Sequence, residues 1–197
     1  MNGRMGRAGG LTPSRRGLLL GGAAALAVAA TGLRPAGAHH GWRSFGDTLF
    51  ELAMAVPGLT RFMAVDLPGG RWGRRGSDGN LDRVVWLLRR LGRDAEAVYG
   101  RSLDEAVLAR AKAGAPWDFV LIDADHTYQG VKGDWLAYGP LAGKAVAFHD
   151  IVGQGKRNIT GLKIEVPRLW QELKDAGREV REFVDPPARM GIGVVLV

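Results

Sequence analysis

The chain has 197 residues, 46% of them hydrophobic, which is enough to bury the core of one ordinary domain. Most of its formal net charge of +7 comes from the first 46 residues, which hold six arginines and no acid. The remainder has 21 basic and 20 acidic residues and gives no electrostatic case for a nucleic-acid partner. Because the chain has no cysteine, disulfides, thiolate metal sites and cysteine nucleophiles are excluded.

The amino-terminal segment has the outline of a twin-arginine export signal. Arg15 and Arg16 precede an apolar run that is too short for a membrane span, and Ala36-Gly37-Ala38 offers a small-residue cleavage site. Residues 1–40 are therefore predicted to be a signal-like or disordered leader, and residues 41–197 the folded domain. Two alternatives stay open: an Ala/Gly-rich extension from a wrongly chosen start, or a poor first strand at residues 26–30.

From residue 47 onward, segments with helical spacing alternate with short apolar runs, a pattern typical of a parallel sheet covered by helices. Ser102 and Glu105 form a capping-box pattern at the start of one helix. The last two strands read as an antiparallel closing pair. The predicted helices are 47–56, 81–91, 102–113, 128–138 and 164–176, and the predicted strands are 61–66, 95–99, 119–122, 145–148, 179–184 and 192–197, with a loop at 67–79.

Two of these strands end abruptly in acids and histidines. The first is followed by Asp123, Asp125 and His126, and the second by His149 and Asp150. Ligands of open α/β sheets bind beyond the carboxyl ends of the strands, so these side chains are expected to share one site. Carboxylates and neutral imidazoles suit Mg²⁺ or a similar divalent ion, which would activate a substrate hydroxyl. Alternatively His126 or His149 is a general base without a metal, or some of the acids only cap helices.

A second set of residues could hold a nucleoside. Asp66 ends the strand 61–66, where its carboxylate could accept two hydrogen bonds from a ribose diol; a turn or cap role is the alternative. The segment from Gly41 to Gly46 resembles a glycine loop, although Arg43 stands where the middle glycine belongs.

The sequence resembles the class I S-adenosylmethionine-dependent methyltransferases, in particular the group of cephalosporin-hydroxylase-like proteins and metal-dependent O-methyltransferases. The resemblance covers roughly residues 41–197 and rests on the run from Asp118 to Tyr128, on Asp134 and Trp135, and on Phe148-His149-Asp150. Two features depart from the family: no first strand with its acid is recognisable before Gly41, and the glycine pair before the fifth strand is thinned to Ala142-Gly143-Lys144.

The resemblance implies a role for most of the candidate residues. Asp66 would hold the cofactor ribose, Arg101 and Ser102 would lie by the adenine, and Gly41 and Gly46 would contact the cofactor through their backbone. Asp123, His149 and Asp150 would bind the divalent cation. Asp123, His126 and His149 are the catalytic candidates.

These inferences predict a Rossmann-like α/β fold with a mostly parallel sheet, helices on both faces and an antiparallel C-terminal strand pair. The expected function is methyl transfer from S-adenosylmethionine to a hydroxyl of a small molecule, assisted by a divalent cation. The alternatives are a metal-dependent hydroxylase-like member of the same group, or a degenerate or exported binding protein without turnover. The chemistry favours the cytoplasm over export, and a homo-oligomer is compatible with it.

Overall fold

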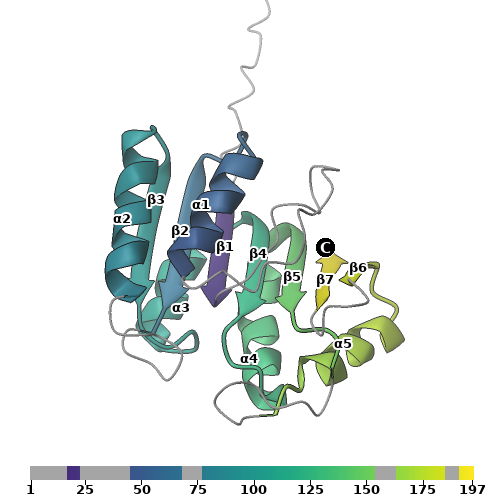
Figure 1. The fold of residues 1–197 in the computed structure, drawn as a ribbon. Coiled ribbons are helices and arrows are strands. Elements are labelled where there is room, and N and C mark those ends of the chain that lie inside the picture. Colours follow the sequence, from purple (N-terminus) through teal and green to yellow (C-terminus); the bar gives the residue numbers. More distant parts are fainter. Residues whose placement is uncertain (1–16, 23–44, 68–76, 154–162, 185–190) are drawn as a thin grey trace, which may run out of the picture.

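The computed structural model describes residues 17–22, 45–67, 77–153, 163–184 and 191–197 (Figure 1). The strands are β1 (Gly17–Gly22), β2 (Arg61–Asp66), β3 (Asp94–Tyr99), β4 (Trp117–Asp123), β5 (Ala142–His149), β6 (Val180–Val184) and β7 (Gly191–Leu196). The helices are α1 (Phe45–Ala55), α2 (Ser77–Arg90), α3 (Glu105–Gly114), α4 (Tyr128–Tyr138) and α5 (Val166–Asp175), with a 3₁₀ turn at Gly139–Leu141.

The described strands form one sheet in the order β3-β2-β1-β4-β5-β7-β6. The pairs from β3 through β5 are parallel, whereas β7 runs antiparallel to both β5 and β6. The strand order reverses between β1 and β4, which is the topological switch point where open α/β sheets bind ligands. The predicted fold class is confirmed, including the antiparallel pair at the C-terminus.

The central strand β1 lies in a segment whose sequence predicts no strand. Leu19 pairs with Met63 of β2 on one side and with Val120 of β4 on the other. The alternative strand at 26–30 falls outside the described residues, and β1 takes the place between β2 and β4. A short apolar run bounded by glycines fits the hydrophobic part of an export signal as well as a buried parallel strand, so its letters alone do not separate the two. Strand β1 therefore lies within residues 1–40, the segment that the sequence predicts to be a leader.

Most predicted elements are found within a few residues of their expected ends, but the capping box at Ser102 is wrong. The N-cap of α3 is Asp104, whose side chain makes no capping hydrogen bond. Its Oδ2 instead accepts a hydrogen bond from the backbone N–H of Arg101 at 3.0 Å, and the Ser102 hydroxyl bonds to Asp134 of α4. The Ser102 hydroxyl thus makes a tertiary contact with α4 and does not form the predicted cap. Helix α2 also begins at Ser77, inside the predicted loop.

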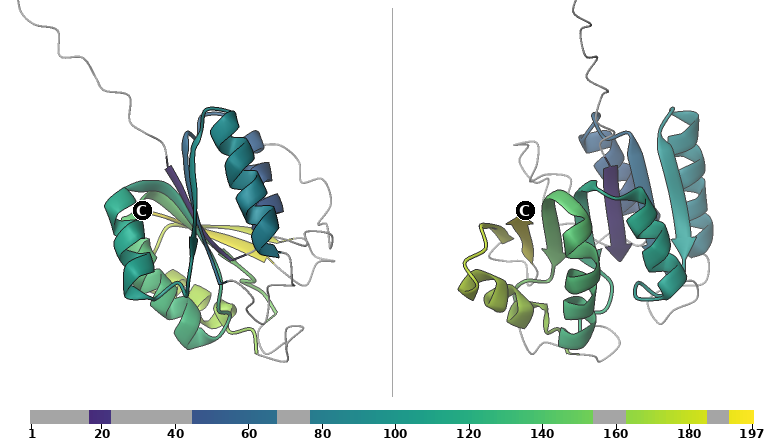
Figure 2. Two further views of the ribbon diagram at one scale, coloured as in Figure 1. Left: turned by 90° about the vertical axis from the view of Figure 1, so that its left-hand side faces the viewer. Right: turned by 180° about the vertical axis from the view of Figure 1, so that it is seen from behind.

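Helices cover both faces of the sheet (Figure 2). Helices α1 and α2 pack one face, where Leu49, Leu81 and Leu88 contact alternate residues of the strands. Helices α3, α4 and α5 pack the other face, where Val107, Val131 and Trp170 contact the residues between them. This alternation buries side chains on both faces of β2, β4 and β5. None of the described helices is long and apolar enough to cross a membrane.

Candidate active site

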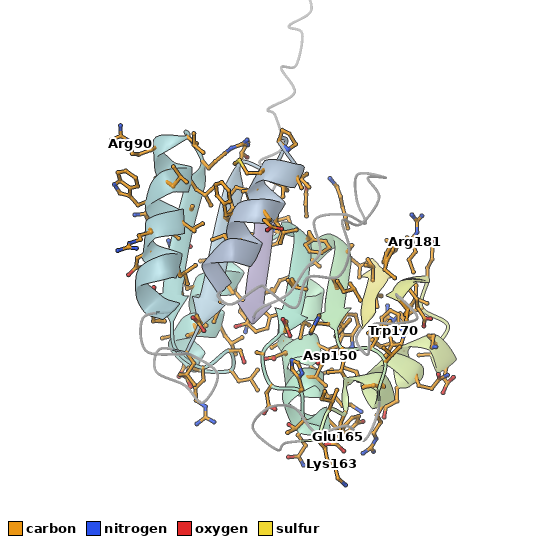
Figure 3. The ribbon with its side chains drawn as sticks, viewed as in Figure 1. Arg90, Asp150, Lys163, Glu165, Trp170 and Arg181 are labelled. Carbon is orange, nitrogen blue, oxygen red and sulfur yellow. The ribbon has the colours of Figure 1, made fainter. Side chains whose placement is uncertain are left out.

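Strands β4 and β5 bring the two predicted halves of the site together. Ile122 lies opposite Phe148 in their parallel register, so the following residues of the two strands, Asp123 and His149, end side by side. Asp150 follows directly and lies at this carboxyl edge (Figure 3). His126 comes from the loop between β4 and α4. The expectation that these side chains meet at one edge is confirmed for Asp123, His126, His149 and Asp150.

The four side chains form a contiguous network. His126 bridges the two aspartates, with its Nε2 2.9 Å from Asp123 Oδ1 and its Nδ1 3.0 Å from Asp150 Oδ2. His149 Nδ1 lies 3.3 Å from Asp123 Oδ1 and 3.5 Å from Asp150 Oδ1. Each imidazole therefore faces both carboxylates.

The loop that carries His126 is fixed by its neighbours in sequence and by α5. Asp125 is not one of the four network residues, and its Oδ1 accepts a hydrogen bond from the backbone N–H of Thr127 at 2.9 Å. Thr127 caps α4 by accepting from the N–H of Gly130. The N–H of Glu165 donates to the His126 carbonyl at 2.8 Å, and the Glu165 carboxylate accepts from the Tyr128 N–H. No local pattern points to Glu165, because its contact with His126 joins residues 39 positions apart.

Burial and mutual attraction set the protonation of this network. Only 6% of Asp123 and 4% of Asp150 is exposed. Burial alone would raise the pKa of Asp123, but His149 and His126 outweigh it and lower that pKa below its usual value. Burial would likewise lower the pKa of His126, yet its bonds to Asp123 and Asp150 raise it to about 10. The pKa of His149 is also raised, against its burial, chiefly by Asp123.

The network has the donors that a divalent cation requires. Asp123, His126 and His149 each offer one ligand atom, and these atoms lie within 4.8 Å of one another. Among the described residues, Asp123 Oδ2 and Asp150 Oδ1 are buried without a hydrogen-bond partner. Buried carboxylate oxygens without partners are costly, and a cation would satisfy them. The residues present therefore fit a divalent cation, with His126 joining the ligands expected from the sequence.

Asp150 also has an unusual backbone. Its φ of 60° lies in the left-handed region, and it is the one non-glycine residue with a positive φ in the described chain. Such a conformation costs about 1 kcal/mol for a residue with a side chain and is concentrated at functional sites. The next residue is held in place, because the Ile151 N–H donates to the Gly191 carbonyl at the start of β7. The closing strand pair thus helps to aim the Asp150 carboxylate.

Comparisons with known proteins decide the fold. No family sequence model matches the chain, and a sequence comparison with curated proteins gives no significant match. Solved structures match it closely in architecture. The O-methyltransferase TomG from Streptomyces achromogenes, in complex with S-adenosylmethionine, matches with a TM-score of 0.57 at 18% identity, over 92% of this chain and 73% of its own.

Two further structures agree. An O-methyltransferase from Bacillus cereus, in complex with S-adenosylhomocysteine, matches with a TM-score of 0.56 at 16% identity, over 92% of this chain and 74% of its own. MycE of the mycinamycin pathway, in complex with Mg, S-adenosylhomocysteine and mycinamycin VI, matches with a TM-score of 0.50 at 15% identity, over 92% of this chain and 44% of its own. The chain has the class I methyltransferase fold. At these identities the likeness establishes the architecture, and the chemistry has to be argued from the site.

In this methyltransferase fold, the ends of β1, β2 and β3 form the other half of the carboxyl edge. Gly21 pairs with Val65 and Gly22 with Asp123, while Asp66 pairs with Tyr99. Asp66 thus lies near the end of the central strand, as its predicted role requires. Its Oδ1 accepts a hydrogen bond from the Leu67 N–H at 2.8 Å, and its carbonyl accepts one from the Gly100 N–H.

The predicted glycine loop needs correction. Gly46 is the second residue of α1, so it lies in a helix; Gly41 falls outside the described residues. The structure places a different glycine pair, Gly21-Gly22, at the carboxyl end of the central strand. In the sequence this pair follows the twin arginines and therefore lies within the signal-like pattern. The signal for a strand is an apolar run that ends in two glycines, a pattern typical of a first strand that leads into a nucleotide-binding turn.

Proposed function

We propose that the protein transfers a methyl group from S-adenosylmethionine to a hydroxyl of a small molecule, with a divalent cation held at the ends of β4 and β5. The observation that carries this proposal is the buried network of Asp123, His126, His149 and Asp150 at the switch-point edge of a methyltransferase fold. The structural neighbours TomG and MycE are described with the cofactor or its product bound, and MycE also with Mg.

The cofactor would lie over the ends of β1, β2 and β3. The Asp66 carboxylate would accept hydrogen bonds from both ribose hydroxyls, since it follows the strand next to the central one. Arg101 and Ser102, in the loop after β3, would lie by the adenine. Gly22, at the end of β1, would let the backbone approach the cofactor closely, because a glycine has no Cβ in the way. Because β1 and β4 are neighbours in the sheet, this cofactor site would adjoin the acid and imidazole network.

The protonation of the network bears on a cation beside the cofactor. Bonds to Asp123 and Asp150 raise the pKa of His126 to about 10, so this imidazole holds a proton at pH 7. A divalent cation bound there would displace that proton and bring positive charge in its place. When bound, the cation supplies Lewis acidity that lowers the pKa of an acceptor hydroxyl. The protein's part is to orient that oxygen against the methyl carbon.

The donor atoms also indicate which cations to test. Magnesium prefers oxygen ligands, whereas imidazole suits zinc, iron and other first-row transition ions. With two histidines beside the carboxylates, Mn²⁺ or Fe²⁺ is at least as well matched as the Mg²⁺ expected from the sequence. The acceptor is a small molecule in this proposal, because residues 47–197 hold 21 basic and 20 acidic residues, a balance that gives no electrostatic case for a nucleic acid.

The deciding experiment is a calorimetric titration of the full chain with S-adenosylmethionine, without added metal and then with Mg²⁺ or Mn²⁺. Cofactor binding under at least one condition is the expected result. Absence of binding under all three conditions would overturn the proposed reaction. Because the titration needs no acceptor, it is independent of the substrate.

A second candidate is favoured by one observation. Two histidines and one carboxylate, which Asp123, His126 and His149 provide, are also the ligands of non-haem Fe²⁺ oxygenases. This metal-dependent hydroxylase function would be supported if the protein bound Fe²⁺ tightly but failed to bind S-adenosylmethionine. Cofactor binding with Mg²⁺ or Mn²⁺ would favour the methyltransferase instead.

A further inference from the structure

Two side chains of α4 reach across to the loop that follows β3. Asp134 and Tyr138 lie one helical turn apart and therefore share a face of α4. Asp134 accepts a hydrogen bond from the Ser102 hydroxyl, and the Tyr138 hydroxyl donates to the Ser102 carbonyl at 2.5 Å. One residue of the loop is thus held at both its side chain and its backbone.

This contact keeps a costly group in the interior. Only 3% of Asp134 is exposed, and its Oδ1 is buried without a hydrogen-bond partner among the described residues. Burial, helped by the charge of Asp125, raises the pKa of Asp134 to about 6, although the bond from Ser102 opposes the rise. An asparagine would accept the same hydrogen bond from Ser102 without burying a charge.

The rest of the loop fits the same helix closely. A Cβ atom at Gly133 would lie only 2.8 Å from Leu103 Cδ1, so the glycine allows the loop to approach. Within the loop, the Arg101 N–H is bound to the Asp104 carboxylate. Helix α4 begins two residues after His126, so one rigid helix connects the acid and imidazole network with this loop.

We propose that Asp134 and Tyr138 are positioning residues that clamp Ser102 and its loop in the conformation that receives the adenine of the cofactor. The inference rests on the proposed function, because it takes the loop after β3 to be the adenine side of the cofactor site. It adds two residues that do not touch the cofactor themselves and act through Ser102.

The test uses three variants that separate the clamp from general stability. Asp134→Ala removes the acceptor for Ser102, and Asp134→Asn keeps an acceptor of the same size. Tyr128→Phe is the matched control, because Tyr128 lies on α4 but bonds through its hydroxyl to Glu172 of α5 and not to Ser102. Binding of S-adenosylhomocysteine is measured by calorimetry, and thermal unfolding is measured for every variant.

Asp134→Ala is expected to weaken S-adenosylhomocysteine binding about tenfold, the usual scale for one lost buried hydrogen bond, whereas Asp134→Asn binds like the parent. Tyr128→Phe is expected to lower the unfolding temperature without changing the affinity. Equal affinity in Asp134→Ala and the parent would overturn the clamp. An equal loss of affinity in Tyr128→Phe would also overturn it, because the effect would then come from helix stability.

Hydrogen exchange of the backbone amides of residues 100–104 in the unliganded protein gives a second readout. Faster exchange in Asp134→Ala and in a Tyr138→Phe variant, but not in Tyr128→Phe, supports the clamp whether or not the cofactor binds. Unchanged exchange overturns it. If the parent fails to bind S-adenosylhomocysteine while exchange responds as expected, the failure lies with the proposed function and the clamp on Ser102 stands.

Discussion

The two halves of the carboxyl edge are built in different ways. At the ends of β4 and β5, four titratable side chains form a buried network in which each imidazole has a nitrogen close to a carboxylate oxygen. At the ends of β1, β2 and β3, the features are a carboxylate, Asp66, a glycine pair and a loop anchored to α4. Side chains define the first half, and backbone shape defines the second. Mutations should therefore affect the first half through charge and the second through geometry.

The largest effect should come from removing the strand on which the second half depends. A protein without residues 1–38 lacks β1, so β2 and β4 lose their common neighbour and the sheet is divided. We expect no cooperative thermal unfolding by circular dichroism, because a sheet split at its centre loses its core. The control lacks only residues 1–13 and keeps both the twin arginines and β1; it should unfold like the parent. Cooperative unfolding of 39–197 would contradict the role of β1 and favour a cleavable leader.

The next largest effect tests the side-chain half. Asp123→Asn removes the charge that faces both histidines, so Mn²⁺ binding should weaken by more than about a hundredfold, beyond the usual loss for a residue that only orients a ligand. Asp118→Asn is the matched control, since this aspartate lies at the opposite end of β4 in an exposed pair with Lys144. Calorimetric titration with Mn²⁺ measures both. Equal affinities in the two variants would refute the cation site.

A smaller effect tests the backbone half. Asp66→Ala should weaken S-adenosylmethionine binding by roughly thirtyfold, which corresponds to about 2 kcal/mol for the lost hydrogen bonds between a carboxylate and the ribose. Asp94→Ala, at the amino end of the neighbouring strand β3, should leave binding unchanged. Equilibrium dialysis or calorimetry gives the two dissociation constants. An Asp66→Ala protein that binds like the parent would refute the ribose assignment.

The smallest effect, counted per pH unit, is a dependence of cation affinity on pH. The pKa of His126 is raised to about 10, so a cation must displace its proton at any pH below that value. The affinity for Mn²⁺ should therefore rise about tenfold per pH unit between about pH 6 and pH 8, and more steeply if His149 also gives up a proton. The lowered pKa of Asp123 adds no proton in this range. Calorimetry in buffers of different ionisation enthalpy counts the protons released, and a count of zero would contradict direct ligation by His126.

The side-chain half was readable from the sequence because its residues are adjacent in the chain to apolar runs. Asp123 and His149 end two strands that the apolar, β-branched composition of their residues predicts. Because these strands are parallel, their carboxyl ends lie at one edge of the sheet. His126 was foreseen as a base candidate, and its position between two aspartates came from the structure. Glu165 and the Asp134 bond to Ser102 could not be foreseen, because each depends on contacts between segments more than thirty positions apart.

By itself, the sequence determined the alternation of helices and strands, the antiparallel pair at the C-terminus and the acid and imidazole residues of the site. These features follow from local periodicity and from polar groups placed after buried runs, and both are encoded by neighbouring residues. Only the tertiary structure decided that Gly17–Gly22 is the central strand, that the Ser102 capping pattern is not used and that His126 bridges Asp123 and Asp150. The physical reason is that an apolar run can pack, and a hydroxyl can form a hydrogen bond, in several alternative ways. The packing of segments distant in the sequence selects one of these alternatives.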